Sequence, residues 1–322
     1  MMTIAGNAQN TIMKRMDFRR LAAICTILCC GAATSSARAA THVSIDGKRW
    51  QINGQPTYPG AAAEGLLLNV RMVNAVFEDE NRKDFDADAN TEEFIARIPD
   101  YMSHGIRAFT LCLQGGAPGY ERAENSAFNR DGSLRDGYLA RVRKVIEACD
   151  RVGAVVILGC YYQRQDQRLA DEQAVRAGVV NVANWIRESG FTNVVLEVAN
   201  ELGHGGFDHA ILKSPEQHVE LIRAAKQAHP QLLVSTSGLG DGSAAERLAE
   251  DCDFLLIHFN NTRLDDIPRR IAALKKYRKP IVCNEDNKTG ADGARAARLC
   301  VEHGASWGLM AEPVNQRFPF EF

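Results

Sequence analysis

Two short stretches of the 322-residue chain end in the same dipeptide: Val194-Val195-Leu196-Glu197-Val198-Ala199-Asn200-Glu201 and Pro280-Ile281-Val282-Cys283-Asn284-Glu285. In each, an almost unbroken apolar run precedes the pair Asn-Glu. Such a run is typical of a parallel strand that is buried on both faces. A strand that ends at a carboxylate places that carboxylate at the rim of its sheet. The two stretches therefore predict two carboxylates at one edge of a parallel sheet.

Strand and helix patterns alternate outward from these two stretches. Strands are expected at 57–61, 107–113, 154–160, 193–199, 232–236, 254–258, 280–283 and 306–310, of which the first has the weakest pattern. Helices are expected at 91–103, 137–152, 171–188, 215–228, 244–250, 267–276 and 291–303. Eight strands with intervening helices predict an α/β fold, the (β/α)₈ TIM barrel. Only residues 313–322 follow the last strand, so the eighth helix is expected to be missing.

The N-terminal part predicts a processed segment and then a hairpin. Basic residues at 14–20, an apolar stretch at 21–33 and the small-x-small site Ala37-Arg38-Ala39 have the layout of a secretory signal peptide. Residues 1–39 are expected to be removed, and 40–322 to form one catalytic barrel domain that is secreted or periplasmic. Alternating residues on both sides of Asp46-Gly47 predict an N-terminal β-hairpin.

The composition of residues 40–322 argues against several classes of partner. Residues 40–322 carry 33 basic and 39 acidic side chains, a net charge of −6, which does not favour nucleic acid. No further long apolar segment predicts membrane insertion. Six cysteines lie beyond the signal peptide without the paired spacing of a zinc site, so neither a metal nor another cofactor is expected.

The ends of the expected strands carry the candidate site, because barrel enzymes keep their active sites at the C-terminal ends of the strands. The polar and aromatic residues found there are Gln114, Tyr161, Tyr162, Asn200, Glu201, Ser237, His258, Asn260, Glu285 and Trp307. A pair of carboxylates is the minimum equipment for cleaving a glycosidic bond. The long segment 64–90, which includes Asn69, Arg71 and Asn74, is interpreted as the loop that sets substrate choice.

These residues resemble clan A glycoside hydrolases, and among them the cellulase-like family 5. The resemblance runs from about residue 43 to Trp307 and rests on Val198-Ala199-Asn200-Glu201 and Val282-Cys283-Asn284-Glu285, on the fourth and seventh strands. It implies that Glu201 is the acid/base, that Glu285 is the nucleophile, and that the anomeric configuration is retained. The chain departs from that family at Tyr161-Tyr162, where relatives often have histidines, and at Asn260, close to where a tyrosine often follows the strand-six histidine.

The resemblance also suggests roles for the neighbouring residues. Asn200 would bind the sugar 2-hydroxyl, His258 would orient Glu285 or a sugar hydroxyl, and Trp307 would contact a pyranose ring. Tyr161, Tyr162, Gln114 and Asn260 are further candidates for substrate binding. Glu201 must hold a proton when Glu285 attacks, so a raised pKa is expected for it.

Several alternatives compete with a retaining hydrolase of β-linked carbohydrate. The two glutamates could form structural ion pairs, and His258 and Trp307 could serve only packing. The chain could be a non-catalytic carbohydrate-binding barrel. It could also be a metal-dependent hydrolase that uses His204, His209 or His258, although no motif such as HExxH supports this.

Overall fold

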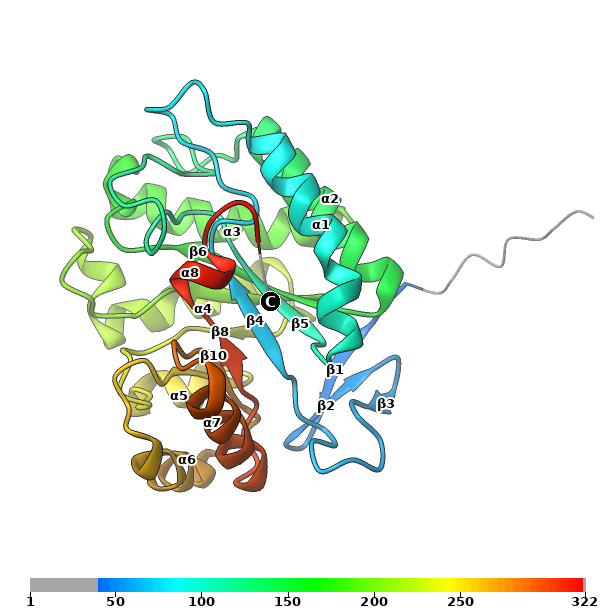
Figure 1. Cartoon of the computed structure of the whole chain (residues 1–322). Coiled ribbons are helices and arrows are strands. Elements are labelled where there is room, and N and C mark those ends of the chain that lie inside the picture. The colour runs from blue at the N-terminus through cyan, green and yellow to red at the C-terminus, as the bar shows by residue number, and fades with distance from the viewer. Residues whose placement is uncertain (1–39, 321–322) are drawn as a thin grey trace, which may run out of the picture. The chain divides into compact units, whose positions relative to one another are not determined.

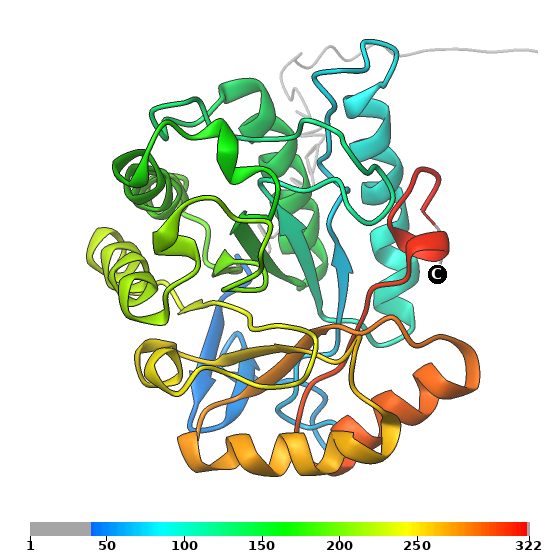
Figure 2. The ribbon, with the colours of Figure 1, turned by 90° about the vertical axis from the view of Figure 1, so that its left-hand side faces the viewer.

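The structure is a computed structural model that describes residues 40–320. Its centre is a ring of eight parallel strands surrounded by helices (Figure 1, Figure 2). The strands are β4 (Asn69–Met72), β5 (Ala108–Cys112), β6 (Val155–Tyr161), β7 (Val194–Ala199), β8 (Val234–Ser235), β9 (Leu255–His258), β10 (Ile281–Glu285) and β11 (Gly308–Leu309). The signal peptide predicted at 1–39 lies outside the described residues.

The ring closes through two kinds of pairing. Six strands pair in the order β11-β4-β5-β6-β7-β8, and β9 pairs with β10. Single parallel bridges complete the circle: Ser237 with Leu256 next to β8 and β9, and Val282 with Ser306 and Asp286 with Leu309 next to β10 and β11. The predicted TIM barrel is therefore confirmed. By strand count, Glu201 follows the fourth barrel strand and Glu285 ends the seventh.

Helices α1 (Ala87–Ser103), α2 (Asp136–Val152), α3 (Glu172–Glu188), α4 (Pro215–Ala228), α5 (Glu246–Asp251), α6 (Ile267–Leu274) and α7 (Gly290–Glu302) connect the strands. Side chains cap three of their N-termini: Asp86 on α1, Asp171 on α3 and Ser214 on α4 each accept a backbone N–H. Such caps satisfy amides that have no partner within the helix. The apolar faces of the helices pack on the outward side chains of the strands.

The N-terminal hairpin was predicted correctly and closes the bottom of the barrel. It consists of β1 (Val43–Asp46) and β2 (Arg49–Ile52), followed by the short β3 (Gln55–Pro56). Trp50 is fully buried, and its ring meets the edge of Phe254 at a centroid distance of 5.0 Å. It belongs to an apolar cluster with interior residues of the strands, such as Val195 and Leu256. The lower half of the barrel is therefore filled mainly by apolar side chains.

The first barrel strand was predicted at the wrong place. Residues 57–61 form bends and turns, with Tyr58 and Gly60 in the left-handed region (φ 50° and 77°). The strand is β4, within the segment that the sequence analysis interpreted as a loop. Asn69 and Arg71 disguise it, because they place polar groups at alternate positions of an otherwise apolar run. Both side chains are fully buried, so they belong to the barrel and not to a substrate loop.

The eighth helix is reduced to one turn, α8 (Glu312–Asn315), after which the chain runs on toward α1 (Figure 1). Phe320 is fully buried there, with its ring edge against Phe94 of α1 at 5.9 Å. The backbone N–H of Phe320 donates to Glu93 at 3.2 Å. Gln316 donates to the backbone oxygen of Arg71 at 2.6 Å. An irregular segment thus packs where a full helix packs elsewhere in the ring.

An irregularity in β10 decides which way its last residue points. Cys283 pairs with Ile257 and Glu285 pairs with His258, so Asn284 is an extra residue in the register. Val282 lies in the apolar cluster inside the barrel. In a regular strand, residues 282 and 285 would point to opposite faces, because side chains alternate. The extra residue resets this alternation, as β-bulges do, and turns Glu285 toward the interior.

All six cysteines within residues 40–320 are unpaired and buried. Burial raises the pKa of their thiols, to about 12 for Cys112 and about 11 for Cys252. Among the residues that the structure describes, no helix is long and apolar enough to cross a membrane.

The C-terminal segment offers a test of how the barrel closes. We expect Phe320→Ala to lower the free energy of unfolding by about 3–5 kcal/mol, because a fully buried aromatic ring is lost from its site against α1. Urea denaturation measures the change. Phe318→Ala in the same segment is the control, since Phe318 is 49% exposed and should change stability little. Equal effects of the two substitutions would contradict the packing described here.

Candidate active site

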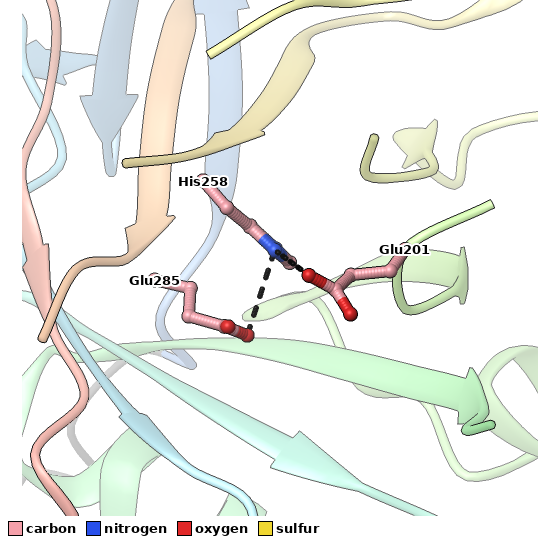
Figure 3. A group of neighbouring side chains, drawn as sticks. All are labelled: Glu201, His258 and Glu285. Carbon is pink, nitrogen blue, oxygen red and sulfur yellow. Dashed lines mark ion pairs between the residues drawn. The ribbon is translucent and has the colours of Figure 1, made fainter. Parts of the chain in front are cut away.

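Three side chains from three strands converge at the C-terminal mouth of the barrel. The imidazole of His258 lies between two carboxylates, with Nδ1 3.6 Å from Oε1 of Glu201 and 3.5 Å from Oε2 of Glu285 (Figure 3). One oxygen of Glu201 lies within 4.8 Å of one oxygen of Glu285. The side chain of Glu201 is 14% exposed and that of Glu285 is 4% exposed. The structure thus brings the two strand-end carboxylates together.

A buried arginine from the first barrel strand, β4, supports this group. Arg71 of β4 is fully buried, and its Nε lies 3.2 Å from Oε2 of Glu285. Its Nη1 contacts Oε2 of the fully buried Glu197 at 2.9 Å, and its Nη2 donates to Oδ1 of Asn200 at 2.6 Å. The guanidinium fork thereby links β4, β7 and β10. Such a planar group meets several acceptors at once in fixed directions.

Amide side chains donate one hydrogen bond to each of the two glutamates. Asn260, just beyond β9, donates through Nδ2 to Oε1 of Glu285. Gln163, just beyond β6, donates to Oε2 of Glu201 at 3.2 Å and accepts from Nδ2 of Asn200 at 2.9 Å. The orientation of both carboxylates is therefore set by donors from neighbouring strand ends.

The backbone of Glu201 adopts an unfavourable conformation. Its φ is 53°, in the left-handed region where residues with a Cβ are disfavoured. Its N–H donates to Oγ of Ser237 at 3.0 Å, and its carbonyl accepts the N–H of His204 at 2.9 Å. Strain of this kind costs about 1–3 kcal/mol and persists only where surrounding contacts impose it. The turn directs Glu201 across the mouth of the barrel toward Glu285.

The pKa of Glu201 is shifted in the opposite direction to the one that the sequence analysis expected. Burial alone would raise the pKa of Glu201, but the neighbouring imidazole of His258, together with His204 and Arg71, more than offsets it. The pKa of Glu201 in this structure therefore lies below its ordinary value. A carboxyl group whose pKa is lowered by folding stabilises the fold above its unfolded pKa, and that contribution is lost as the pH falls through the folded value.

Two predicted substrate-binding residues lie outside this group. The hydroxyl of Tyr161 donates to the backbone oxygen of Val175 in α3, and its ring packs against Phe128, so it belongs to the layer between strand and helix. Gln114 is fully buried and donates to both Ser126 and the backbone oxygen of Gln165. Its own oxygen accepts the N–H of Tyr162 at 3.2 Å. These contacts hold both side chains within the barrel wall, and the assignment of Tyr161 and Gln114 to substrate binding stays a prediction.

Trp307 contacts residues outside the group of Glu201, His258 and Glu285. Its Nε1 donates to Asp286 at 2.8 Å, and its ring packs with the apolar cluster between the barrel and α6–α7. The assignment of Trp307 as a sugar platform stays a prediction. Tyr162, by contrast, lies near the site. Burial raises the pKa of its hydroxyl well above the usual range, and the charge of Glu285 raises it further.

The histidines named as metal ligands are placed apart from one another. Nδ1 of His209 pairs with the buried Asp166 at 2.8 Å, and Nδ1 of His204 accepts the N–H of Gly206 at 2.9 Å. Within residues 40–320, the one group spaced to hold a cation consists of Glu201, His258 and Glu285. The positive guanidinium of Arg71 contacts this group directly, and it would repel a cation bound there.

The sequence analysis gave no site role to Glu197 or Gln163, and it placed Arg71 in a substrate loop instead of the barrel interior. A usable signal was present for Arg71: in Leu66-Leu67-Leu68-Asn69-Val70-Arg71-Met72-Val73 the polar residues stand at alternate positions. This is the pattern of a strand with one polar face. Glu197 stands two residues after Val195, so it shares the inward face of its strand.

Comparison with known proteins concerns the fold. No family model and no curated protein matches the sequence. A putative glycoside hydrolase from Bacteroides vulgatus ATCC 8482 superposes with a TM-score of 0.59 at 13% identity, over 84% of this chain and 55% of that chain. The β-mannanase of the blue mussel Mytilus edulis gives 0.57 at 14% identity, over 85% and 92% of the chains. A family 5 glycoside hydrolase from Prevotella bryantii B14 gives 0.54 at 13% identity, over 76% and 88%.

The fold resembles that of the cellulase-like family 5 glycoside hydrolases. The chain spans about half the length of the first of these structures and most of the other two. At identities of 13–14% the likeness shows the fold.

Replacing Arg71 tests the buried charge network. We expect Arg71→Met to lower the free energy of unfolding by about 3–5 kcal/mol, because Glu197 and Glu285 lose their shared counter-ion while remaining buried. The control is Arg223→Met, whose ion pair with Asp251 involves a side chain that is 60% exposed, and we expect a change of at most about 1 kcal/mol. Chemical denaturation near neutral pH distinguishes the two. Similar losses in both variants would contradict the network.

Replacing His258 tests the cause of the lowered pKa. In His258→Gln the imidazole no longer favours the charged form of Glu201, so we expect the pKa of Glu201 to rise. Titration of side-chain carboxyl groups by carbon-13 NMR measures it, with Glu201→Gln identifying the signal. His303→Gln, at the C-terminal end of α7, should leave the titration unchanged. A constant or lower pKa in the His258 variant would refute this explanation.

Proposed function

We propose that the chain is a secreted retaining glycoside hydrolase that cleaves β-glycosidic bonds in a poly- or oligosaccharide by double displacement. The observation that carries this proposal is the separation of at most 4.8 Å between one oxygen of Glu201 and one oxygen of Glu285. Retaining enzymes hold their carboxyl groups about 5–5.5 Å apart, and inverting enzymes hold them about 6.5–9.5 Å apart. Secretion rests on the signal-peptide pattern of residues 1–39.

In the first step Glu285 acts as the nucleophile. Arg71 and Asn260 fix its two oxygens, so the carboxylate is oriented before substrate arrives. One oxygen attacks the anomeric carbon while the bond from that carbon to the leaving oxygen breaks. Glu201 donates its proton to the leaving oxygen. The product of this step is a glycosyl ester on Glu285.

In the second step Glu201 accepts a proton from water, and the water oxygen attacks the anomeric carbon and releases Glu285 as a carboxylate. Taking this proton returns Glu201 to the acid form that the next cycle needs, and the carboxyl must keep the proton although its pKa is lowered in this structure. A sugar ring bound over the two carboxylates excludes water and raises that pKa. Asn200 uses Oδ1 for Arg71 and one N–H for Gln163, so its second N–H is left for a sugar hydroxyl.

Substitution of the two glutamates tests the mechanism. We expect Glu285→Gln to abolish turnover of an activated aryl glycoside, and Glu201→Ala to slow it by roughly 10²–10⁴-fold. Added azide should restore the Glu201→Ala enzyme and yield a β-glycosyl azide, because azide attacks the glycosyl ester without general-base help. Glu302→Gln, on the exposed face of α7, is the control. Near wild-type activity of Glu285→Gln would refute the proposal.

The two competing functions differ in simple readouts. A non-catalytic carbohydrate-binding barrel would bind glycans but release no reducing ends from a broad panel. A metal-dependent hydrolase would lose activity on chelation and recover it when metal is added. The proposed mechanism predicts release of reducing ends that is indifferent to chelator.

A further inference from the structure

A pocket that contains several charged side chains opens beside the proposed acid/base. It has a volume of about 700 Å³ and is lined by residues of the loops that follow β5, β6 and β7. Two of its lining residues contact Glu201 directly. Gln163 donates to its carboxylate at 3.2 Å, and His204 donates its backbone N–H to the carbonyl at 2.9 Å. A sugar unit next to the bond being cleaved can therefore reach this pocket.

The charged side chains of the pocket do not all neutralise one another. Arg168 pairs with Glu124 at 2.8 Å, and it also contacts Glu80. Glu121 accepts the N–H of Gly119 at 3.1 Å. The two remaining charged groups are Arg122 and Arg164. Both are exposed, and neither forms an ion pair or a side-chain hydrogen bond with any part of the chain from 40 to 320.

The backbone at these two arginines is also unusual. Arg122 has a φ of 67° and Arg164 a φ of 66°, in the region that favours glycine. Glu201 shares this conformation, with a φ of 53°. Two strained arginines thus line the cavity, and the strained Glu201 adjoins it through its hydrogen bonds with Gln163 and His204. Strained residues cluster at ligand sites, where the side chain is what the position supplies.

We infer that this pocket binds an anionic unit of the glycan, through a carboxylate or a sulfate ester carried by the sugar next to the cleaved bond. The inference rests on the proposed function and names the class of substrate for that site. Guanidinium groups pair with planar or tetrahedral oxyanions through two parallel N–H donors, and Arg122 and Arg164 both have their donors available. The substrate is thus an acidic β-linked glycan, and a purely neutral chain leaves both arginines unpaired.

The test compares oligosaccharides of one β-linked backbone in neutral, uronate-bearing and sulfated forms. For the double variant Arg122→Gln/Arg164→Gln we expect KM on the preferred anionic form to rise roughly three- to tenfold, with kcat and the neutral form little changed. Added salt should raise KM of the wild-type enzyme in the same direction. The uronate and sulfate arms show which anion the pocket selects.

The matched control is Arg278→Gln. Arg278 is also an exposed arginine in the left-handed region (φ 55°), but it precedes β10 at the opposite end of the barrel. Equal loss on neutral and anionic substrates, or no preference of the wild-type enzyme for an anionic form, would overturn the inference while leaving the hydrolase proposal intact.

Binding separates the two proposals when turnover is absent. The Glu285→Gln protein should bind the anionic oligosaccharide in a calorimeter, and the added arginine substitutions should weaken that binding by a similar factor. If binding depends on the two arginines but the wild-type protein hydrolyses nothing, the result would support anion binding in the pocket. It would refute the proposed hydrolase reaction. Unchanged binding after the arginine substitutions would refute the inference that the pocket binds an anionic sugar.

Discussion

The guanidinium group of Arg71 is the constraint on which the mouth of the barrel depends. It lies at the centre of a polar layer, with Glu197 at 2.9 Å, Glu285 at 3.2 Å and Asn200 at 2.6 Å. Burying one such charge costs several kcal/mol unless its partners meet it with good geometry. The partners come from strands four and seven, while Arg71 comes from strand one. One side chain thereby fixes the relative positions of three strand ends.

The polar layer is supported from below and completed from above. The hairpin inserts Trp50 beneath it, and the lower half of the barrel is filled mainly by apolar side chains. The loops above contribute Gln163 and Asn260, which orient the carboxylates that Arg71 does not fully satisfy. Electrostatic interactions strengthen in such an apolar surrounding. The architecture therefore places its strongest interactions where the proposed chemistry occurs.

The sequence predicted the barrel and the meeting of two strand-end carboxylates, because long apolar runs and their ordinal positions survive without knowledge of contacts. It did not predict the role of Arg71, because a buried charge disguises a strand as a loop. It also assigned Tyr161 and Trp307 to the site. Counting strands locates their ends but not the face to which each side chain points, and both residues turn toward the helices. The face to which a side chain points depends on the register of its strand, and a single sequence indicates register poorly.

The extra residue Asn284 in β10 has a consequence for how such a site changes during evolution. Because the orientation of Glu285 depends on a local excess of backbone length, it is robust to substitutions along the strand but sensitive to a change of one residue in its length. A deletion of a single codon here would leave every side chain of the site encoded, yet it would rotate the carboxylate out of the barrel. Such a centre can thus be gained or lost through insertion or deletion of one residue, while the side chains that form it stay the same.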